Sequence, residues 1–207
     1  MSLKKTTKPK VSRRELEISN LKFELNPHTF KNVLQQIQSL SLSTNRAIEN
    51  LMQILNYMLY DTDKEQVPLQ AEIDFMQAYK KMQQSIVPGF VDIIFDNQLD
   101  EAFLQRKAIA PLLTVAFMEN AFKHADTNSK DCVINISLKN IDSDTMLYCI
   151  ENSLSAVNTQ KQKSGIGNKN LRRRLDLIYK ERYEISSDVE KDAYRSVLKI
   201  KLFDHED

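Results

Sequence analysis

The feature that most constrains the fold of this chain is a change of hydrophobic pattern at Pro88-Gly89. Before this point apolar residues recur with helical spacing, and after it short runs alternate apolar and polar residues, as strands do. Helices followed by strands and further helices predict an α+β chain. We expect a helical hairpin followed by a two-layer α/β sandwich.

The helical part predicts two amphipathic helices joined by a short polar break. The first runs from Ser12, an N-cap candidate, to about Leu42, and the second follows Ser43-Thr44-Asn45. The first carries an apolar stripe at every seventh position, formed by Leu16, Phe23, Phe30 and Ile37. One antiparallel hairpin cannot cover both apolar stripes, so we expect two copies to pair into a four-helix bundle, which makes the protein a homodimer.

A histidine beside a proline interrupts the first helix. Pro27 should kink the helix, and His28 lies on the side away from Phe30 at about 100° per residue. Asn32, one turn later, shares the face of His28. A solvent-exposed histidine on a bundle helix is the structural alternative to a functional one.

The second part alternates helices and strands. Pro68 should open a helix, and a further helix should span Lys107 to Ala125, with Pro111 in its opening turns. The remaining predicted elements are strands at 91–96, 132–139, 146–151, 183–187 and 195–202, a turn at 142–144, and a helix at 169–179.

Composition narrows the classes of function. The formal net charge is +1, which does not indicate a general attraction to nucleic acid or anionic membranes. Cys132 and Cys149 lack the spacing of a zinc site or a disulfide framework, which fits a reducing cytosol. Because no run of about 18 apolar residues occurs, we expect these residues to be cytoplasmic. The basic lead-in, residues 4–10, is compatible with a membrane span further upstream.

Two motifs in the second part are suited to phosphate chemistry. Asn120, Lys123 and His124 lie within one helical turn, so an amide oxygen, an ammonium group and an imidazole can face one magnesium triphosphate. Gly165-Ile166-Gly167 precedes a helix, where glycines and free amide groups can approach an anion. The alternatives are a solvated helix end and a flexible turn.

Taken in order, these motifs resemble those of the LytS/YehU-type sensor histidine kinases. Asn26-Pro27-His28, with Phe30 and Asn32, is similar to the phosphoacceptor motif of that family. Residues 119–124 resemble its N-box, and Gly165-Ile166-Gly167 through Asn170 resemble its GxGLxN box. The resemblance implies a dimerising phosphoacceptor hairpin joined to an ATP-binding domain of the GHKL type. The implied segments are a flexible lead-in (1–11), the hairpin (12–65) and the catalytic domain (66–207).

The resemblance also implies roles for individual residues. His28 would be the nucleophile that takes the phosphoryl group, Asn32 would orient its ring or a water molecule, and Glu119 would position or deprotonate. Asn120 would bind Mg, and Glu151 would accept the adenine amino group. The other implied nucleotide contacts are Lys123, His124, Gly165, Gly167 and Asn170.

The function implied is ATP-dependent autophosphorylation on His28 and transfer to a response regulator. The full-length protein is then expected in the cytoplasmic membrane, with its sensor region upstream and no direct role for nucleic acid. The main alternative is a catalytically silent dimeric module that acts by contact, because segment 151–155 reads Glu-Asn-Ser-Leu-Ser where the family has Asp-x-Gly-x-Gly. A third hypothesis is a nucleotide-binding protein without histidine transfer, which leaves Pro27-His28 unexplained.

Overall fold

The computed structural model describes residues 45–205 except 90, 155–168 and 191. The helices are α2 (Asn45–Asn56), the π-helix η1 (Tyr57–Asp61), α3 (Leu69–Gln84), α4 (Glu101–Arg106), α5 (Val115–His124) and α6 (Lys169–Ile178). The strands are β1 (Val67–Pro68), β2 (Asp92–Gln98), β3 (Lys107–Ile109), β4 (Val133–Asn140), β5 (Thr145–Ser153), β6 (Tyr183–Glu190), β7 (Ala193–Lys201) and β8 (Phe203–Asp204). His28, Asn32, Gly165, Gly167 and the first helix of the expected hairpin lie outside the described residues.

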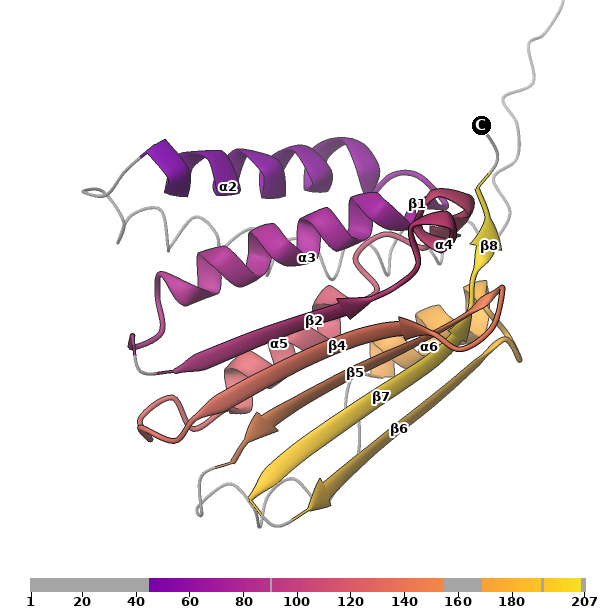
Figure 1. Cartoon of the computed structure of the whole chain (residues 1–207). Coiled ribbons are helices and arrows are strands. Elements are labelled where there is room, and N and C mark those ends of the chain that lie inside the picture. Colours follow the sequence, from indigo (N-terminus) through magenta and orange to yellow (C-terminus); the bar gives the residue numbers. More distant parts are fainter. Residues whose placement is uncertain (1–44, 90, 155–168, 191, 206–207) are drawn as a thin grey trace, which may run out of the picture.

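A five-stranded sheet with order β2-β4-β5-β7-β6 forms one layer. Only the β2–β4 pair in this sheet is parallel, and the other neighbours are antiparallel. In Figure 1, α5 and α6 lie behind the sheet, α3 runs along its β2 edge, and α2 lies on the far side of α3. The expected α+β two-layer arrangement is therefore confirmed for the second part of the chain.

The start of α3 follows from its local sequence. Pro68 occupies the N-cap position with φ −52°, and Leu69, Ile73 and Met76 recur on one face and are fully buried. The β4–β5 turn is equally local, since the Asp142 carboxylate accepts hydrogen bonds from the backbone N–H groups of residues 144 and 145. Both elements agree with the predictions from sequence.

The predicted helix from Lys107 to Ala125 is wrong at its start. Lys107–Ile109 forms β3, which pairs with β1 and β8 in a small second sheet, and α5 begins only at Val115. Pro111 has no backbone N–H to donate, and Leu112 adopts a left-handed conformation with φ 58°. The chain therefore turns sharply between β3 and α5.

The end of the second helix packs directly on α3. In η1, which continues α2, the Tyr57 ring stacks on Phe75 of α3 with 4.6 Å between ring centroids. Ile54, Tyr57 and Met58 are all buried. The domain boundary at residues 65/66 stays a prediction, but the elements on its two sides share one hydrophobic core.

Candidate nucleotide site

The position of α5 is set by aromatic contacts on two sides. Phe117 meets Tyr148 of β5 edge to face at 5.4 Å between ring centroids, and Phe122 meets Tyr79 of α3 at 6.1 Å. Burial raises the pKa of Tyr79, and the negative charge of Glu119 raises it further, so Glu119 lies on the side of α5 that faces α3.

Asn120 and His124 occupy a different side of α5 from Glu119. At about 100° per residue, both project within about 60° of Phe117, towards the sheet and away from α3. Both side chains are partly buried, and Lys123 beside them is exposed. Asn120, Lys123 and His124 therefore share the last turn of α5, whereas Glu119 projects about 100° or more from Asn120 and His124, on the side of Lys123.

His124 differs from a simple cationic phosphate contact. Burial lowers the pKa of its imidazole, and the positive charge of Lys123 lowers it further. The lowered pKa favours the neutral imidazole of His124, which can offer one N–H donor, whereas Lys123 supplies the positive charge.

Glu151, the predicted adenine contact, lies on the face of β5 that points away from α5. Side chains alternate along a strand, and Tyr148, Ile150 and Asn152 of β5 are buried on the side of α5. Glu151 lies on the opposite, open face, directly across from Arg195 of β7. The side chain of Asn152, and not that of Glu151, therefore lies on the side of β5 that faces α5.

Asn152 has an unusual environment. Its side chain is 1% exposed, its Nδ2 donates to the carbonyl oxygen of Ser153 at 3.1 Å, and its Oδ1 has no hydrogen-bond partner among the described residues. An unpaired buried acceptor costs about 1–3 kcal/mol, which is rarely retained without a functional reason. Oδ1 is an acceptor that a bound ligand can satisfy.

The location of Asn152 places this acceptor beside the motif on α5. It lies along β5 between the Phe117–Tyr148 contact and the isolated bridge that joins Ala125 to Leu154. The last turn of α5 runs alongside the same stretch. Asn152 therefore lies on the part of β5 that runs beside the last turn of α5, which carries Asn120 and His124, and the sequence alone did not assign it.

Asn170 lies in the first turn of α6 and is partly buried. It stands directly after the Gly165-Ile166-Gly167 motif, which is outside the described residues, so the structure does not place that motif against α5. Further along α6, Arg174 is buried and donates to the carbonyl oxygen of Pro111. Sequence reasoning missed this contact, because an arginine on a basic amphipathic helix carries no local sign of burial.

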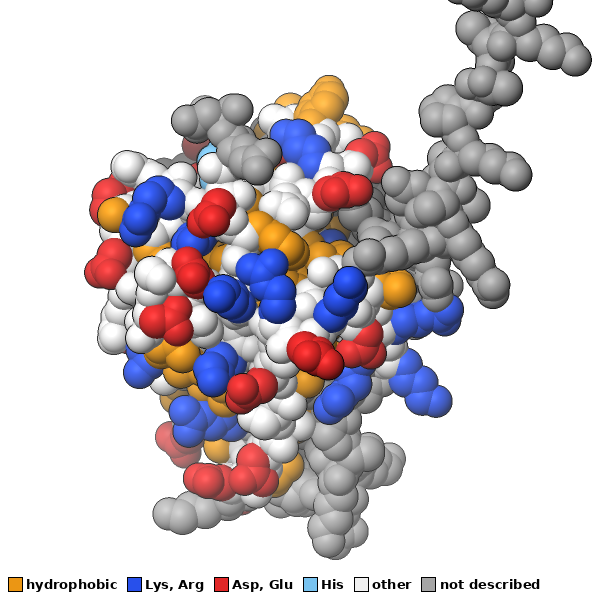
Figure 2. All heavy atoms as spheres, turned by 90° about the vertical axis from the view of Figure 1, so that its right-hand side faces the viewer, with side chains coloured by type: hydrophobic (Ala, Val, Ile, Leu, Met, Phe, Trp, Pro, Cys, Tyr) orange, Lys and Arg blue, Asp and Glu red, His pale blue; other side chains and the backbone are white. Residues whose placement is uncertain are grey.

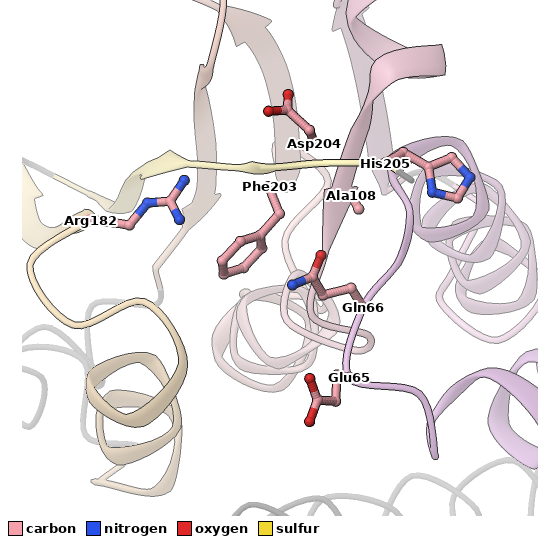
Figure 3. A pocket seen from close by; sticks show the side chains of 7 residues that line it. All are labelled: Glu65, Gln66, Ala108, Arg182, Phe203, Asp204 and His205. Atoms are coloured by element: carbon pink, nitrogen blue, oxygen red, sulfur yellow. The ribbon is translucent and has the colours of Figure 1, made fainter. Parts of the chain in front are cut away.

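A separate open hollow of about 620 Å³ lies at the other end of the sheet, as Figure 3 shows. Its lining comes from residues 65–66, β3, β8 and the turn before β6, and consists of Glu65, Gln66, Ala108, Arg182, Phe203, Asp204 and His205. Arg182 already packs over the Phe203 ring and donates to the carbonyl oxygen of Leu202. Figure 2 shows acidic and basic side chains interspersed over the face that includes this end.

Comparison with known proteins finds sequence similarity to histidine kinases. A family model described as histidine kinase matches residues 16–88. The sensor protein LytS of Enterococcus faecalis is 28% identical over 122 residues, which cover 57% of this chain and 20% of that protein. In sequence, the chain is similar to the LytS-type sensor histidine kinases. The sensor histidine kinase/phosphatase LytS of Staphylococcus aureus is likewise 28% identical over 121 residues, 56% of this chain and 20% of that protein.

The chain spans about a fifth of the length of these curated relatives. Among solved structures, the kinase domain of the blue-light activated histidine kinase of Erythrobacter litoralis gives a TM-score of 0.48 at 14% identity. That match covers 91% of this chain and 92% of the solved one. Within the described residues no helix combines the length and apolar character needed to cross a bilayer.

Proposed function

We propose that this chain is the cytoplasmic part of a sensor histidine kinase that uses Mg-ATP to phosphorylate His28 and then passes the phosphoryl group to an aspartate of a response regulator. The observation that carries the proposal is the unpaired, buried Oδ1 of Asn152 beside the last turn of α5. An exocyclic amino group of adenine is a donor that fits this acceptor. Asn152 thereby takes the role first expected for Glu151.

The donor set on α5 fits the remaining parts of a magnesium nucleotide. Asn120 offers one amide oxygen, and Mg²⁺ commonly takes one or two protein oxygens and completes its shell with phosphate oxygens and water. Among the described residues no group of three His, Cys, Asp or Glu side chains forms an independent metal site. Mg²⁺ is therefore proposed only as the ion bound together with the phosphates, with Lys123 and His124 as donors to them.

The chemistry asked of His28 is nucleophilic attack on phosphorus. Mg-ATP supplies the terminal phosphoryl group when it is bound. A neutral imidazole nitrogen of His28 forms a bond to phosphorus while the bond to the leaving oxygen of ADP breaks, and the imidazole proton is lost to solvent. The roles of Asn32, Gly165, Gly167 and Asn170 belong to the same proposal.

The oligomeric state and the cellular setting complete the proposal. Two large apolar side chains, Met52 of α2 and Leu59 of η1, are about half or more exposed. They supply an apolar surface for the first helix of the hairpin and for a second copy. The membrane anchor and sensor region would belong to the longer protein of which these residues form a part.

The decisive experiment incubates the purified 207-residue chain with Mg²⁺ and ATP labelled in the γ-phosphoryl group, beside a His28→Gln variant. We expect acid-labile label on the wild type alone, since a phosphoramidate bond is acid-labile. Label that survives His28→Gln would overturn the assignment of His28. Measurable Mg-ATP binding without any label would favour a nucleotide-binding protein without histidine transfer, and neither binding nor label would favour the silent dimeric module.

A further inference from the structure

The segment between β3 and α5, residues 110–114, is fixed by side chains from other elements. The N–H of Ala110 donates to the Tyr179 hydroxyl at 2.8 Å. The N–H groups of Leu112 and Thr114 donate to the carboxylate of Glu72 at 2.9 and 3.0 Å. Leu112 has φ 58°, which is unfavourable for a residue with a side chain, so these contacts hold the segment in a conformation it would not adopt alone.

Glu72 of α3 is the centre of this arrangement. It is fully buried, and its two oxygens accept four hydrogen bonds. One oxygen accepts from the Tyr57 hydroxyl and Leu112 N–H, and the other from Thr114 N–H and, at 2.6 Å, the Thr114 hydroxyl. Each of these four donors makes a separate hydrogen bond to the carboxylate. Losing any one of them therefore leaves the buried carboxylate with one hydrogen bond fewer.

The opposite side of the segment is held by α6. The guanidinium group of Arg174 donates to the carbonyl oxygen of Pro111 and is 1% exposed. Burial lowers the pKa of Arg174, and the negative charge of Glu72 opposes that change. The two charged groups therefore interact electrostatically across the segment. The start of α5, which carries Asn120, is thus held between α3 and α6.

Tyr57 brings the second helix of the expected hairpin into the same cluster. It belongs to η1, which continues α2, and its ring stacks on Phe75. Burial raises the pKa of Tyr57, and the negative charge of Glu72 raises it further, so both favour the protonated hydroxyl that donates to Glu72. A π-helical turn often marks a place where a helix serves a functional contact.

We propose that Glu72 is a positioning residue that couples the hairpin to the nucleotide site, because one carboxylate binds both Tyr57 of η1 and the segment that sets α5. A displacement of α2 and η1 that withdraws the Tyr57 hydroxyl changes the balance of hydrogen bonds on Glu72. The hydrogen bonds from the N–H groups of Leu112 and Thr114 to this carboxylate then weaken, and the start of α5 is held less firmly. The inference rests on the proposed function for its kinetic consequence, but its structural part does not require ATP.

The test uses Tyr57→Phe in the full 207-residue chain, which removes the hydroxyl and keeps the ring. Tyr60→Phe is the matched control, since Tyr60 lies on the same π-helix and is 71% exposed. We expect Tyr57→Phe to slow labelling of His28 about tenfold while the Kd for Mg-ATP changes less than about threefold. Tyr60→Phe should change neither quantity. An unchanged labelling rate in Tyr57→Phe, or a rate and a Kd that change by the same factor, would overturn the coupling.

Hydrogen exchange separates this inference from the proposed function. In Tyr57→Phe the amides of Leu112 and Thr114 should exchange about threefold faster or more, and in Tyr60→Phe they should not. If the wild type takes no label but the exchange changes as expected, the proposed function fails and the coupling stands. If the exchange is unchanged, the coupling fails even in an active kinase. Should Tyr57→Phe not fold, Glu72→Gln must show the same faster exchange.

Discussion

Replacing Asn152 by leucine should weaken nucleotide binding without destabilising the unliganded protein. Leucine has the same branching at Cγ but no polar atoms. The substitution removes the unpaired Oδ1, which costs about 1–3 kcal/mol, and it loses the Nδ2 bond to Ser153, worth about 1 kcal/mol. The free energy of unfolding should therefore rise by about 0–2 kcal/mol, an increase in Tm of up to roughly 8 °C for a chain of this size.

Thermal unfolding with and without Mg-ATP measures both effects. A ligand that binds the folded state stabilises it by RT ln(1 + [L]/Kd), so the wild type should gain more from Mg-ATP than Asn152→Leu does. Loss of one hydrogen bond to the base should raise the Kd at least about tenfold. Asn135→Leu is the matched control, because Asn135 is exposed on the open face of the neighbouring strand β4.

The reasoning is refuted by the opposite pattern. If Asn152→Leu lowers the Tm without ligand and Mg-ATP stabilises both proteins equally, then Asn152 serves the packing of β5 and Oδ1 is not a ligand contact. If Asn135→Leu weakens Mg-ATP binding as strongly as Asn152→Leu, the loss does not arise on the helix side of the sheet.

Three further predictions concern single residues. Asn120→Ala should abolish Mg-ATP binding in calorimetry while the dimer persists in sedimentation, and unchanged affinity would refute its role as a metal ligand. Glu151→Gln should change the Kd less than about twofold, because the carboxylate lies on the open face of β5, and a large loss would restore Glu151 as the base contact. Lys107, whose Nζ lies 2.7 Å from Asp144 and 2.6 Å from Asp204, should give a pH-dependent stability. Burial lowers the pKa of Lys107, but the hydrogen bonds to both carboxylates outweigh it and raise the pKa overall, and the hydrogen bond from Lys107 lowers the pKa of Asp144. The stabilisation is therefore fully present between about pH 4 and pH 10, and it is lost as the pH falls through the lowered pKa of Asp144 or rises through the raised pKa of Lys107. In urea unfolding, the difference between the wild type and Lys107→Met should shrink below about pH 4, and a constant difference would contradict this.

The sequence predicted correctly those helices and turns that are determined by residues close together in the chain. The helix after Pro68 and the turn at Asp142 depend on residues within a few positions of each other, and both are found where the sequence indicates. The helix predicted from Lys107 failed at its start because the apolar run from Ala108 to Leu113 is buried on all sides. Periodicity cannot distinguish a buried strand and turn from a buried helix in so short a run.

The site was predicted in part. Asn120, Lys123 and His124 share a helical turn in the sequence and in the structure, because three to four residues always bring side chains together on a helix. Glu151 was assigned by its chemical similarity to aspartate. The alternation of Tyr148 and Ile150 would have placed Asn152 on the helix side instead, since a shift of one residue in a strand reverses the face.

Long-range contacts could not be read from the chain. Glu72 and Arg174 each occur on an amphipathic helix among other charged residues, where a solvated position is the ordinary expectation. Their burial follows from segment 110–114, which is close to neither of them in sequence. A buried charge with distant partners becomes visible only after the fold has brought those partners together.

The stacking of Tyr57 on Phe75 determines where the chain can be cut to make a stable fragment or joined to make a chimera. A fragment that begins at residue 66 removes Ile54, Tyr57 and Met58 from the face of α3, which exposes Phe75 to water and takes one donor from Glu72. Such a fragment would carry a new apolar patch and a tendency to self-associate. Chimeras that exchange this part of the chain with a related protein should therefore be joined before Asn45, so that α2 and η1 stay with α3, on which they pack.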